Sequence, residues 1–283
     1  MNLVFSFDKE YIPTFKVFLY SIYLNNQNEH INIFLLHYDM EQDALNDLKS
    51  IVETYHFKFH SINCRKILKK TDDITINRYY TIEMYLWLYA PYVLPKEVDR
   101  ALYLDPDIIN LNNIHRFYDL EFEEHLFIAM DYKIKNKIVQ PFNNLRLGTL
   151  TAEHYFNAGV VLMNIAQLRN ERGSEEISKA VAENKAILIL PDQDIFNYLY
   201  TDKIKNAKWE LYNLDPRLYQ FFQLLKPEAY NKEWVEDEVV FIHYGGKHKP
   251  WQEREKYKMD LGAYYFQYEE QLNQITIESS VEN

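Results

Sequence analysis

The feature that most constrains the fold is the alternation of short apolar runs with amphipathic segments over the first 165 residues. After the first run, Phe15, Phe18, Leu19 and Ile22 recur at i, i+3, i+4 and i+7, which predicts a helix that begins near Pro13. Strand-length runs occupy residues 3–7, 31–37, 57–62 and 101–104, and further helices are expected over 44–55 and 81–90. Strands that alternate with helices predict an α/β fold with a mostly parallel sheet covered on both faces.

The order of elements is looser beyond residue 126. Strands are predicted over 126–130, 158–164 and 239–243, and helices over 177–184 and 193–200. Residues 132–153 show no clear period, so an irregular segment is expected there. We find no repeat and no Gly/Ser linker, so the sequence predicts one α/β domain with C-terminal elaborations and a frayed end over 278–283.

The composition excludes several classes of function. With 31 Lys and Arg against 42 Asp and Glu, the formal net charge of −11 argues against nucleic acid as a partner. The single cysteine, Cys64, rules out an internal disulfide and a cysteine zinc site, and it fits a reducing compartment. No apolar run reaches the roughly 18–20 residues of a membrane span, and no secretory leader follows Met1, so we expect a cytoplasmic protein. None of the six glycines lies in a dinucleotide-binding or P-loop pattern.

Two aspartates follow a predicted buried strand in the run Tyr103-Leu104-Asp105-Pro106-Asp107. Side chains two residues apart in extended backbone point the same way, and two carboxylates held together favour a cation between them. Oxygen ligands suit Mg²⁺ or Mn²⁺, and parallel sheets bind ligands at the carboxyl ends of their strands. A solvated turn also explains Pro and Asp here, so the pair alone leaves a metal site and a turn both open.

A second candidate segment covers residues 243–251, with the sequence HYGGKHKPW, and it follows another predicted strand. His243 can supply a nitrogen ligand at the strand end. The two glycines let backbone amides approach an anion closely, and Lys249 can neutralise phosphate. The alternative is an ordinary glycine turn with surface lysines.

Three further segments place small or polar side chains at predicted element boundaries. They are residues 6–11 (SFDKEY), 155–159 (YFNAG) and 191–194 (PDQD). An aspartate at a helix start is first of all an N-cap, which accounts for only one of the two aspartates in the third segment. Taken alone, each segment is also explained as a loop, a strand entry or a cap.

Taken together, the five segments resemble in content and order glycosyltransferase family 8, whose members use UDP-sugars and retain the anomeric configuration. The resemblance runs from Asn2 to about Trp251 and is greatest to bacterial lipopolysaccharide galactosyl- and glucosyltransferases. It implies the GT-A fold, with a mixed central sheet flanked by helices. It also implies a catalytic domain over residues 1–251, followed by a C-terminal helical extension over 252–283.

The resemblance implies a role for each matching position. Asp105, Asp107 and His243 match the ligands of Mn²⁺, with Mg²⁺ as the alternative ion. The positions that match donor-binding residues are Ser6, Asp8 and Tyr11 for uridine, Gly246 and Lys249 for the diphosphate, and Asp131, Asn157 and Ala158 for the sugar. Asp192 and Gln193 match the catalytic pair under the sugar ring.

One position departs from the family pattern. Family members usually carry Arg or Lys in the helix before the paired aspartates, and Trp87 takes this position here. A cation is thereby removed from the phosphate and sugar site, unless another residue such as Arg78 supplies it. The departure keeps open a degenerate member that binds nucleotide or glycan with little transfer. A metal-dependent phosphohydrolase built on the paired aspartates is a third class.

The resemblance also implies the partners. The expected donor is UDP-glucose or UDP-galactose, and the acceptor is a glycan, a glycolipid or a glycoprotein. The divalent ion and Lys249 would stabilise the departing UDP, and the uncharged amide of Gln193 favours front-face attack over an enzyme nucleophile. The aromatic run 264–268 is expected to pack internally or to contact a second copy, because Glu269 and Glu270 oppose binding to anionic lipid. Any membrane association is expected to be peripheral, at the inner face.

Overall fold

The computed structural model describes residues 1–68, 81–149 and 152–281, so Arg78 lies outside the described residues. The chain divides into two compact units. Unit 1 comprises residues 1–9, 30–105 and 120–207, and unit 2 comprises residues 10–29, 106–119 and 208–283. Each unit is described by itself.

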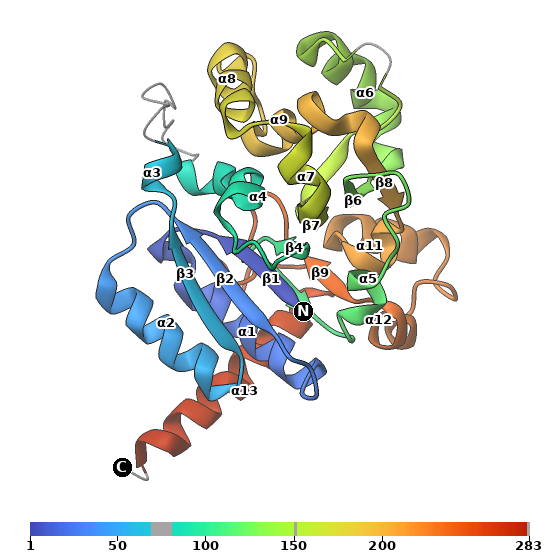
Figure 1. Cartoon of the computed structure of the whole chain (residues 1–283). Helices are drawn as coiled ribbons and strands as arrows, with labels where there is room; N and C mark the ends of the chain where they lie inside the picture. Colours follow the sequence, from blue (N-terminus) through green and yellow to red (C-terminus); the bar gives the residue numbers. More distant parts are fainter. Residues whose placement is uncertain (69–80, 150–151, 282–283) are drawn as a thin grey trace. The chain divides into compact units, whose positions relative to one another are not determined.

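Unit 1 is built on a seven-stranded sheet in the order β3-β2-β1-β4-β7-β6-β8 (Figure 1). Its strands are β1 (Asn2–Ser6), β2 (Asn32–His37), β3 (Lys58–Asn63), β4 (Arg100–Leu104), β6 (Phe127–Asp131), β7 (Phe156–Asn164) and β8 (Ile204–Ala207). Neighbouring strands are parallel except at β7, which is antiparallel to both β4 and β6. The structure confirms the mixed sheet that the resemblance implied: one reversed strand lies in an otherwise parallel sheet.

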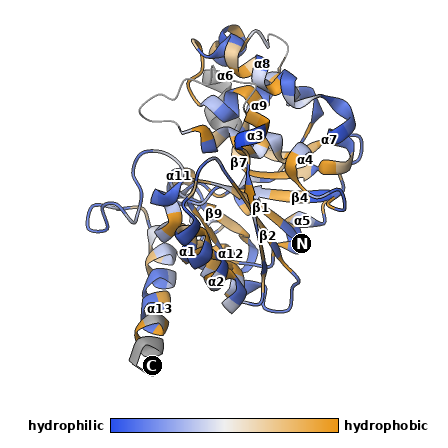
Figure 2. Cartoon of the chain, turned by 60° about the vertical axis from the view of Figure 1, so that its left-hand side comes forward, coloured by the Kyte–Doolittle hydropathy of each residue, from blue (hydrophilic) through white to orange (hydrophobic). Residues whose placement is uncertain are grey.

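The helices of unit 1 follow from where their apolar residues fall. They are α2 (Gln42–Thr54), α3 (Arg65–Leu68), the 3₁₀ helix η2 (Ile82–Tyr89), α4 (Ala90–Val93), α6 (Lys133–Leu147), α7 (Ile165–Glu171), α8 (Ser174–Asn184), α9 (Pro191–Tyr200) and the 3₁₀ helix η3 (Thr201–Lys203). In α2, Leu45, Leu48 and Val52 are buried, at the i, i+3, i+7 spacing of one helix face. The strands β1, β4 and β7, by contrast, are hydrophobic along most of their length (Figure 2), as expected for strands buried on both faces.

The helix predicted over residues 81–90 differs from the one observed. It is the 3₁₀ helix η2, and the chain passes through Pro91 into α4, where Pro91 stands in the first turn and its missing N–H removes no helical bond. Residues 85–89 are all buried, so apolar side chains surround η2 instead of lining one face. A segment buried on every side carries no helical period from which its type could be predicted.

The expectation of an irregular segment over residues 132–153 was wrong. Most of this segment is the helix α6, which ends at Gly148 with φ +69°, in the left-handed region that favours glycine. The helix contains Pro141 in its interior, which predicts a helix break from sequence. Side-chain contacts hold its second half: Gln140 Nε2 and Asn144 Nδ2 both donate to the Ala152 carbonyl, at 3.1 and 2.9 Å.

Unit 2 is mostly helical, with one small sheet. Its helices are α1 (Ile12–Asn25), α5 (His115–Tyr118), α10 (Trp209–Tyr212), α11 (Pro216–Leu225), α12 (Lys232–Glu238) and α13 (Gly262–Val281). The run predicted as a strand over 239–243 forms β9 (Phe241–His243), which pairs antiparallel with β5 (Ile108–Asn110) and not with the seven-stranded sheet. This pairing holds His243 opposite Ile108, one residue after Asp107.

Of the two alternatives expected for the aromatic run 264–268, internal packing is observed for Tyr265 and Tyr268. Tyr265 of α13 is buried, and its ring lies 5.2 Å from Trp251 and 6.1 Å from Tyr244 between centroids. Within the described residues, no helix is at once long enough and apolar enough to cross a bilayer.

Candidate functional site

Four strands of unit 1 present candidate residues at one edge of the sheet. Ser6 ends β1, Asp105 follows β4, Asp131 ends β6, and Asn157 stands near the start of the reversed strand β7. Because β7 runs the other way, its amino end lies at the edge where its neighbours end, and the Asp105 amide donates to the Gly159 carbonyl at 2.8 Å. Adjacent strands are about 4.8 Å apart, so these side chains form a row along the sheet edge.

The first turn of α9 contacts this row directly. Gln193 Oε1 accepts hydrogen bonds from Asn157 Nδ2 at 3.0 Å and from the Ala158 amide at 3.3 Å. Asn157 Oδ1 in turn accepts from the Gly159 amide at 2.9 Å, which fixes the orientation of its side chain. The structure therefore brings together three residues that the sequence assigned to the sugar and to the catalytic pair.

Asp192 is held in a buried aromatic environment. Trp87, which is fully buried, donates from Nε1 to Asp192 Oδ2 at 3.2 Å and stacks on Tyr103 with 5.0 Å between ring centroids. The Tyr103 hydroxyl donates to Asp105 Oδ1 at 2.7 Å. Burial, followed by the nearby charge of Asp105, raises the pKa of Asp192 to about 7, and the Trp87 N–H offsets only part of this rise. Trp87 thus lies beside Asp192 but carries no charge. A basic residue in the same place would lower the pKa of this carboxyl and keep it ionised.

This environment predicts a pH-dependent stability. The pKa of Asp192 is about 7 in the folded chain against an ordinary 3.8, so between these values the folded state keeps a proton that the unfolded state releases. The free energy of unfolding then falls as pH rises through this window, by about 1.4 kcal/mol per pH unit. Without added metal, the stability of the wild type relative to Asp192→Asn should fall by that amount between pH 5 and pH 6. Parallel curves for the two proteins would contradict the raised pKa.

Asp194, the second aspartate of the 191–194 segment, is fully engaged in hydrogen bonds that hold the chain around α9. It is completely buried and accepts from Arg146 Nη1 and Nη2 at 2.7 and 2.6 Å and from the Tyr155 hydroxyl at 2.6 Å. It also accepts from the amides of Ile189 and Leu190, just before α9. Neither aspartate is the N-cap of α9, because Leu190 takes that position, so the cap predicted for one of them was wrong.

Asp131 has a partner that the sequence analysis missed. His154 Nδ1 lies 2.7 Å from Asp131 Oδ2, and the two residues are separated by 23 positions in the chain. The Asp131 side chain is buried, whereas that of His154 is about one third exposed. The pairing orients the imidazole at the end of the row, next to the strand that carries Asn157.

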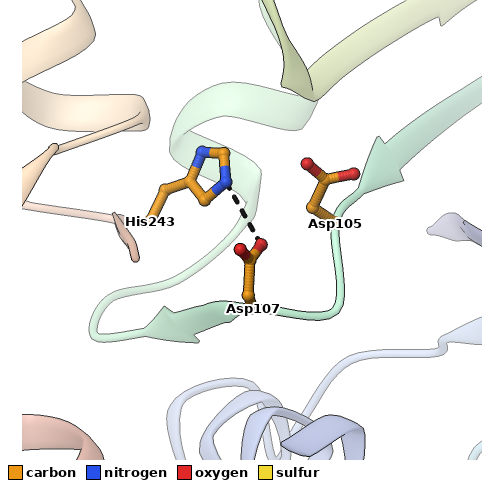
Figure 3. Close-up of side chains that lie close together, drawn as sticks. All are labelled: Asp105, Asp107 and His243. Carbon is orange, nitrogen blue, oxygen red and sulfur yellow. Dashed lines mark ion pairs between the residues drawn. The ribbon is translucent and has the colours of Figure 1, made fainter. Parts of the chain in front are cut away.

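Unit 2 contributes a second cluster, centred on Asp107. Its Oδ1 lies 3.1 Å from His243 Nε2, and its Oδ2 accepts from the Lys249 ammonium, which also donates to the Tyr244 carbonyl at 2.7 Å (Figure 3 shows the aspartates and His243). Burial opposes ionisation of Asp107, but Lys249 and His243 outweigh it and hold the pKa of Asp107 well below its ordinary value. Asp107 is therefore an anion at any physiological pH.

The donor set of these residues fits a divalent cation. Asp105, Asp107 and His243 each offer one ligand atom, and these atoms lie within 4.8 Å of one another. Only one residue separates Asp105 from Asp107 in the chain, which keeps the two aspartates close. The contact between Asp107 and His243 adds the third member of the group. His243 Nδ1 lies 2.8 Å from Asn213 Oδ1, which as an amide oxygen can only accept. When the ring is protonated, its Nε2–H faces Asp107 and lowers the pKa of that carboxyl, and when the ring is neutral, Nε2 presents a lone pair that can bind a cation.

A buried acceptor reinforces this fit. Asp107 Oδ1 accepts no hydrogen bond within the part of the chain that the structure describes. Unsatisfied buried acceptors are rare, and either a proton on His243 Nε2 or a metal ion bound by both residues accounts for this one. Two carboxylates and one imidazole suit Mn²⁺ or Mg²⁺, because hard oxygen ligands predominate.

Gly246 and its surroundings reveal a residue that the sequence analysis missed. Gly246 has φ +92°, a backbone conformation that favours glycine, and a Cβ there would lie 2.6 Å from Arg217 Nη1 and would displace the end of that side chain. Arg217 is held by Asp215, which also caps α11. A second cation therefore lies beside the predicted diphosphate loop. The only sequence signal for it is the capping Asp-Pro-Arg run at 215–217.

The predicted uridine-binding residues lie at and just beyond the end of β1. Ser6 is buried, and Asp8 and Tyr11 are half-buried, with Tyr11 in the 3₁₀ helix η1 (Lys9–Tyr11) that leads into α1. The structure places these three residues in one short segment, as their sequence spacing requires.

Comparison with known proteins decides the family. A family model described as glycosyl transferase family 8 matches residues 2–255. The chain belongs to glycosyl transferase family 8.

Two relatives of this family-8 glycosyltransferase are named as lipopolysaccharide glycosyltransferases. Lipopolysaccharide 1,2-glucosyltransferase from Escherichia coli is 24% identical over 270 residues, which cover 90% of this chain and 74% of the relative. Lipopolysaccharide 1,3-galactosyltransferase from Salmonella typhimurium is 25% identical over 265 residues, covering 88% and 72%. The crystal structure of galactosyltransferase LgtC with donor and acceptor sugar analogues matches with a TM-score of 0.77 and 20% identity over 96% of both chains. This likeness establishes the GT-A fold of the family-8 chain.

Proposed function

We propose that the protein is a retaining hexosyltransferase that moves glucose or galactose from its UDP-sugar to a glycan or glycoconjugate, with Mn²⁺ as the bound ion. The observation that carries the proposal is the group formed by Asp105, Asp107 and His243, in which the buried Asp107 Oδ1 accepts no hydrogen bond from the described residues. Transfer of a sugar from a nucleoside diphosphate needs neutralisation of the departing diphosphate, and this donor set binds an ion that supplies it. Mg²⁺ is the alternative ion, since it shares the preference for oxygen ligands.

The leaving-group side of the reaction is assigned to residues of unit 2. A bound divalent ion would act as a Lewis acid on the diphosphate. Lys249 would exchange its contact with Asp107 for the phosphate oxygens, and the Gly246 amide would donate to them. Arg217 adds a guanidinium beside the same loop, and Arg pairs well with phosphate.

The sugar side of the reaction is assigned to residues of unit 1. Gln193 is oriented by Asn157 and by the Ala158 amide, and it would contact the donor sugar together with those two residues. Asp192 would bind sugar hydroxyls, as would Asp131. Gln193 is a poor nucleophile, which favours attack by the acceptor hydroxyl on the face that UDP leaves, with the departing phosphate accepting the proton.

The remaining assignments rest on the resemblance and on the relatives. Ser6, Asp8 and Tyr11 would bind the uridine, and residues 1–251 would form the catalytic domain with 252–283 as its extension. The relatives named for lipopolysaccharide support a glycolipid or other glycan acceptor.

Thermal unfolding of the full chain tests the proposal. The melting temperature is measured with Mn²⁺ alone, with UDP alone, with both, and then with Mn²⁺ and UDP-glucose, UDP-galactose or UDP-N-acetylglucosamine. A ligand at about 100 times its Kd stabilises the folded state by roughly 2.7 kcal/mol. We expect a large shift only when metal and nucleotide are present together, and the best sugar identifies the donor. No shift in any combination would contradict the proposal.

A second candidate is favoured by the environment of Asp192. Trp87 donates a neutral N–H to Asp192, whose pKa is raised to about 7, so no cation from the described residues is bonded to this carboxyl. A family member of this kind would bind the nucleotide yet transfer little. Release of UDP from the best UDP-sugar, measured with and without a glycan acceptor, separates the two candidates: release excludes the inactive binder.

A further inference from the structure

His154 is a residue of unit 1 to which the proposed function gives no role. Its imidazole Nδ1 lies 2.7 Å from Asp131 Oδ2, and the side chain of His154 is 35% exposed against 1% for that of Asp131. The carboxylate is therefore enclosed, whereas solvent reaches the ring that the carboxylate holds. A ligand at this end of β6 contacts the imidazole before it contacts the carboxylate.

The contact with Asp131 determines what the other ring nitrogen can do. An ionised carboxylate can only accept a hydrogen bond, so His154 Nδ1 is the nitrogen that carries the proton. Nε2 of the neutral ring then presents a lone pair, and the described residues make no hydrogen bond to Nε2. The partner of Nδ1 thus fixes the tautomer of the ring and leaves one directed acceptor.

The backbone around His154 is held by two helices. Gln140 Nε2 of α6 donates to the His154 carbonyl at 3.0 Å. Asn197 of α9 accepts from the Phe156 amide at 2.7 Å and donates to the Phe156 carbonyl at 2.8 Å. The rings of His154 and Phe156 lie 5.5 Å apart between centroids. The imidazole is therefore preorganised, which reduces the entropy that is lost when a ligand binds.

The sheet of unit 1 places this pair next to the residues proposed for the donor sugar. Asp131 is the register partner of Phe156, the residue before Asn157. Asn157 in turn donates to Gln193 at 3.0 Å. Strands β1, β4, β7 and β6 follow one another in the sheet, about 4.8 Å apart. Because β1 ends at the residues proposed for uridine and β7 begins at those proposed for the sugar, β6 lies one strand further along, at the outer side of that sugar.

We infer that His154 binds a hydroxyl group of a hexose through Nε2, with Asp131 as the positioning residue. Because the ligand is a sugar of the proposed reaction, this role rests on the proposed function. A lone pair on a neutral ring suits an alcohol, which donates, and not an ionised phosphate, which only accepts. The hydroxyl belongs either to the outer side of the donor sugar or to the acceptor sugar. In both cases His154 selects among hexoses that differ at the carbon carrying this hydroxyl.

Binding of UDP and of UDP-sugars tests whether the hydroxyl is on the donor. Isothermal titration in Mn²⁺ compares UDP, UDP-glucose and UDP-galactose for the wild type, His154→Ala and His154→Gln. For a donor hydroxyl, His154→Ala should weaken binding of the preferred UDP-sugar by about tenfold, because one hydrogen bond to the sugar is lost. The affinity for UDP should not change. His154→Gln should recover part of the loss, since its amide oxygen can also accept.

Release of UDP tests whether the hydroxyl is on the acceptor. The preferred UDP-sugar is supplied with methyl glucoside, methyl galactoside or lactose as acceptor probe, and the release is compared with that in water alone. For an acceptor hydroxyl, His154→Ala should raise the KM for the saccharide by about tenfold and leave the affinity for the UDP-sugar unchanged. If His154→Ala changes neither the UDP-sugar affinity nor the saccharide-dependent release, His154 has no such role.

Two further variants make the result specific. Asp131→Asn keeps the size of the side chain but can pair with either tautomer of the ring, so it should change the same quantity as His154→Ala, by a smaller factor. The matched control is His125→Ala, a half-exposed histidine that precedes β6 at its other end and whose Nδ1 lies 3.2 Å from the Phe122 carbonyl. This control should change neither quantity.

The outcomes separate this role from the proposed function. An equal effect of His125→Ala would refute the role of His154. So would a His154→Ala variant that loses affinity for UDP as much as for the UDP-sugar, because the effect would then not involve the sugar. Absence of Mn²⁺-dependent UDP binding by the wild type would contradict the proposed function, and the role of His154 with it.

Discussion

Replacing Asp105 by Asn should abolish metal-dependent binding of UDP while leaving the fold intact. The change removes one of the two carboxylates in the group of Asp105, Asp107 and His243. Even partners that only orient metal ligands contribute 10–100-fold to affinity, so loss of a ligand itself should weaken binding by at least about 100-fold. Isothermal titration of UDP in the presence of Mn²⁺ measures the effect.

The same substitution should cost little stability. The amide oxygen of the introduced side chain can still accept from the Tyr103 hydroxyl, and removal of the Asp105 charge relieves Asp192, whose pKa that charge helps to raise. Asp202→Asn is the matched control, because it deletes an equally charged side chain that is exposed in η3 and outside the metal group. If Asp105→Asn bound UDP and Mn²⁺ as the wild type does, the metal assignment would be wrong.

Replacing Arg146 by Met should destabilise the folded chain by about 3–5 kcal/mol, because it strands a buried carboxylate. The Arg146 side chain is 9% exposed and that of Asp194 is fully buried, and the two are joined by a pair of hydrogen bonds. The Tyr155 hydroxyl and two amides still donate to Asp194 in the variant, which places the effect at the lower end of this range. Urea unfolding followed by circular dichroism measures the loss.

The control for this prediction is the same substitution at an exposed ion pair. Arg65 and Asp39 lie 2.8 Å apart with side chains 48% and 64% exposed, so Arg65→Met should cost no more than about 1 kcal/mol. Arg146→Lys keeps the charge but loses the paired hydrogen bonds to Asp194. Its loss of stability should therefore lie between that of Arg146→Met and that of Arg65→Met. An Arg146→Met loss as small as that of Arg65→Met would mean that Asp194 does not depend on its cation.

The elements with a regular apolar period were predicted well. The spacing of Phe15, Phe18, Leu19 and Ile22 predicted α1, and the strand-length runs predicted β1 to β4 within one or two residues. Local patterns of this kind depend only on neighbours in the chain. The grouping of Asp105, Asp107 and His243 was predicted from the resemblance to family 8, whereas the residues alone left a metal site and a turn both open.

What the sequence could not predict depends on contacts between distant residues. His154 meets Asp131 across 23 positions, Arg146 meets Asp194 across 48, and Arg217 meets Gly246 across the fold of unit 2. No local spacing marks such pairs. The helix α6 was missed for a related reason: Pro141 argues locally against a helix, and the contacts that hold the helix come from Ala152 and Asp194.

The reversed strand β7 also bears on how the chain is made. It lies between β4 and β6, yet it begins about 50 residues after β4 ends in the sequence. At a synthesis rate of about 5–20 residues per second, β4 leaves the ribosome several seconds before its partner on that side exists. During this interval β4 is an unpaired edge of apolar sequence, the kind of edge that pairs with other chains. The newly made first half of the protein therefore carries an unpaired apolar edge beside the paired aspartates until β7 closes the sheet.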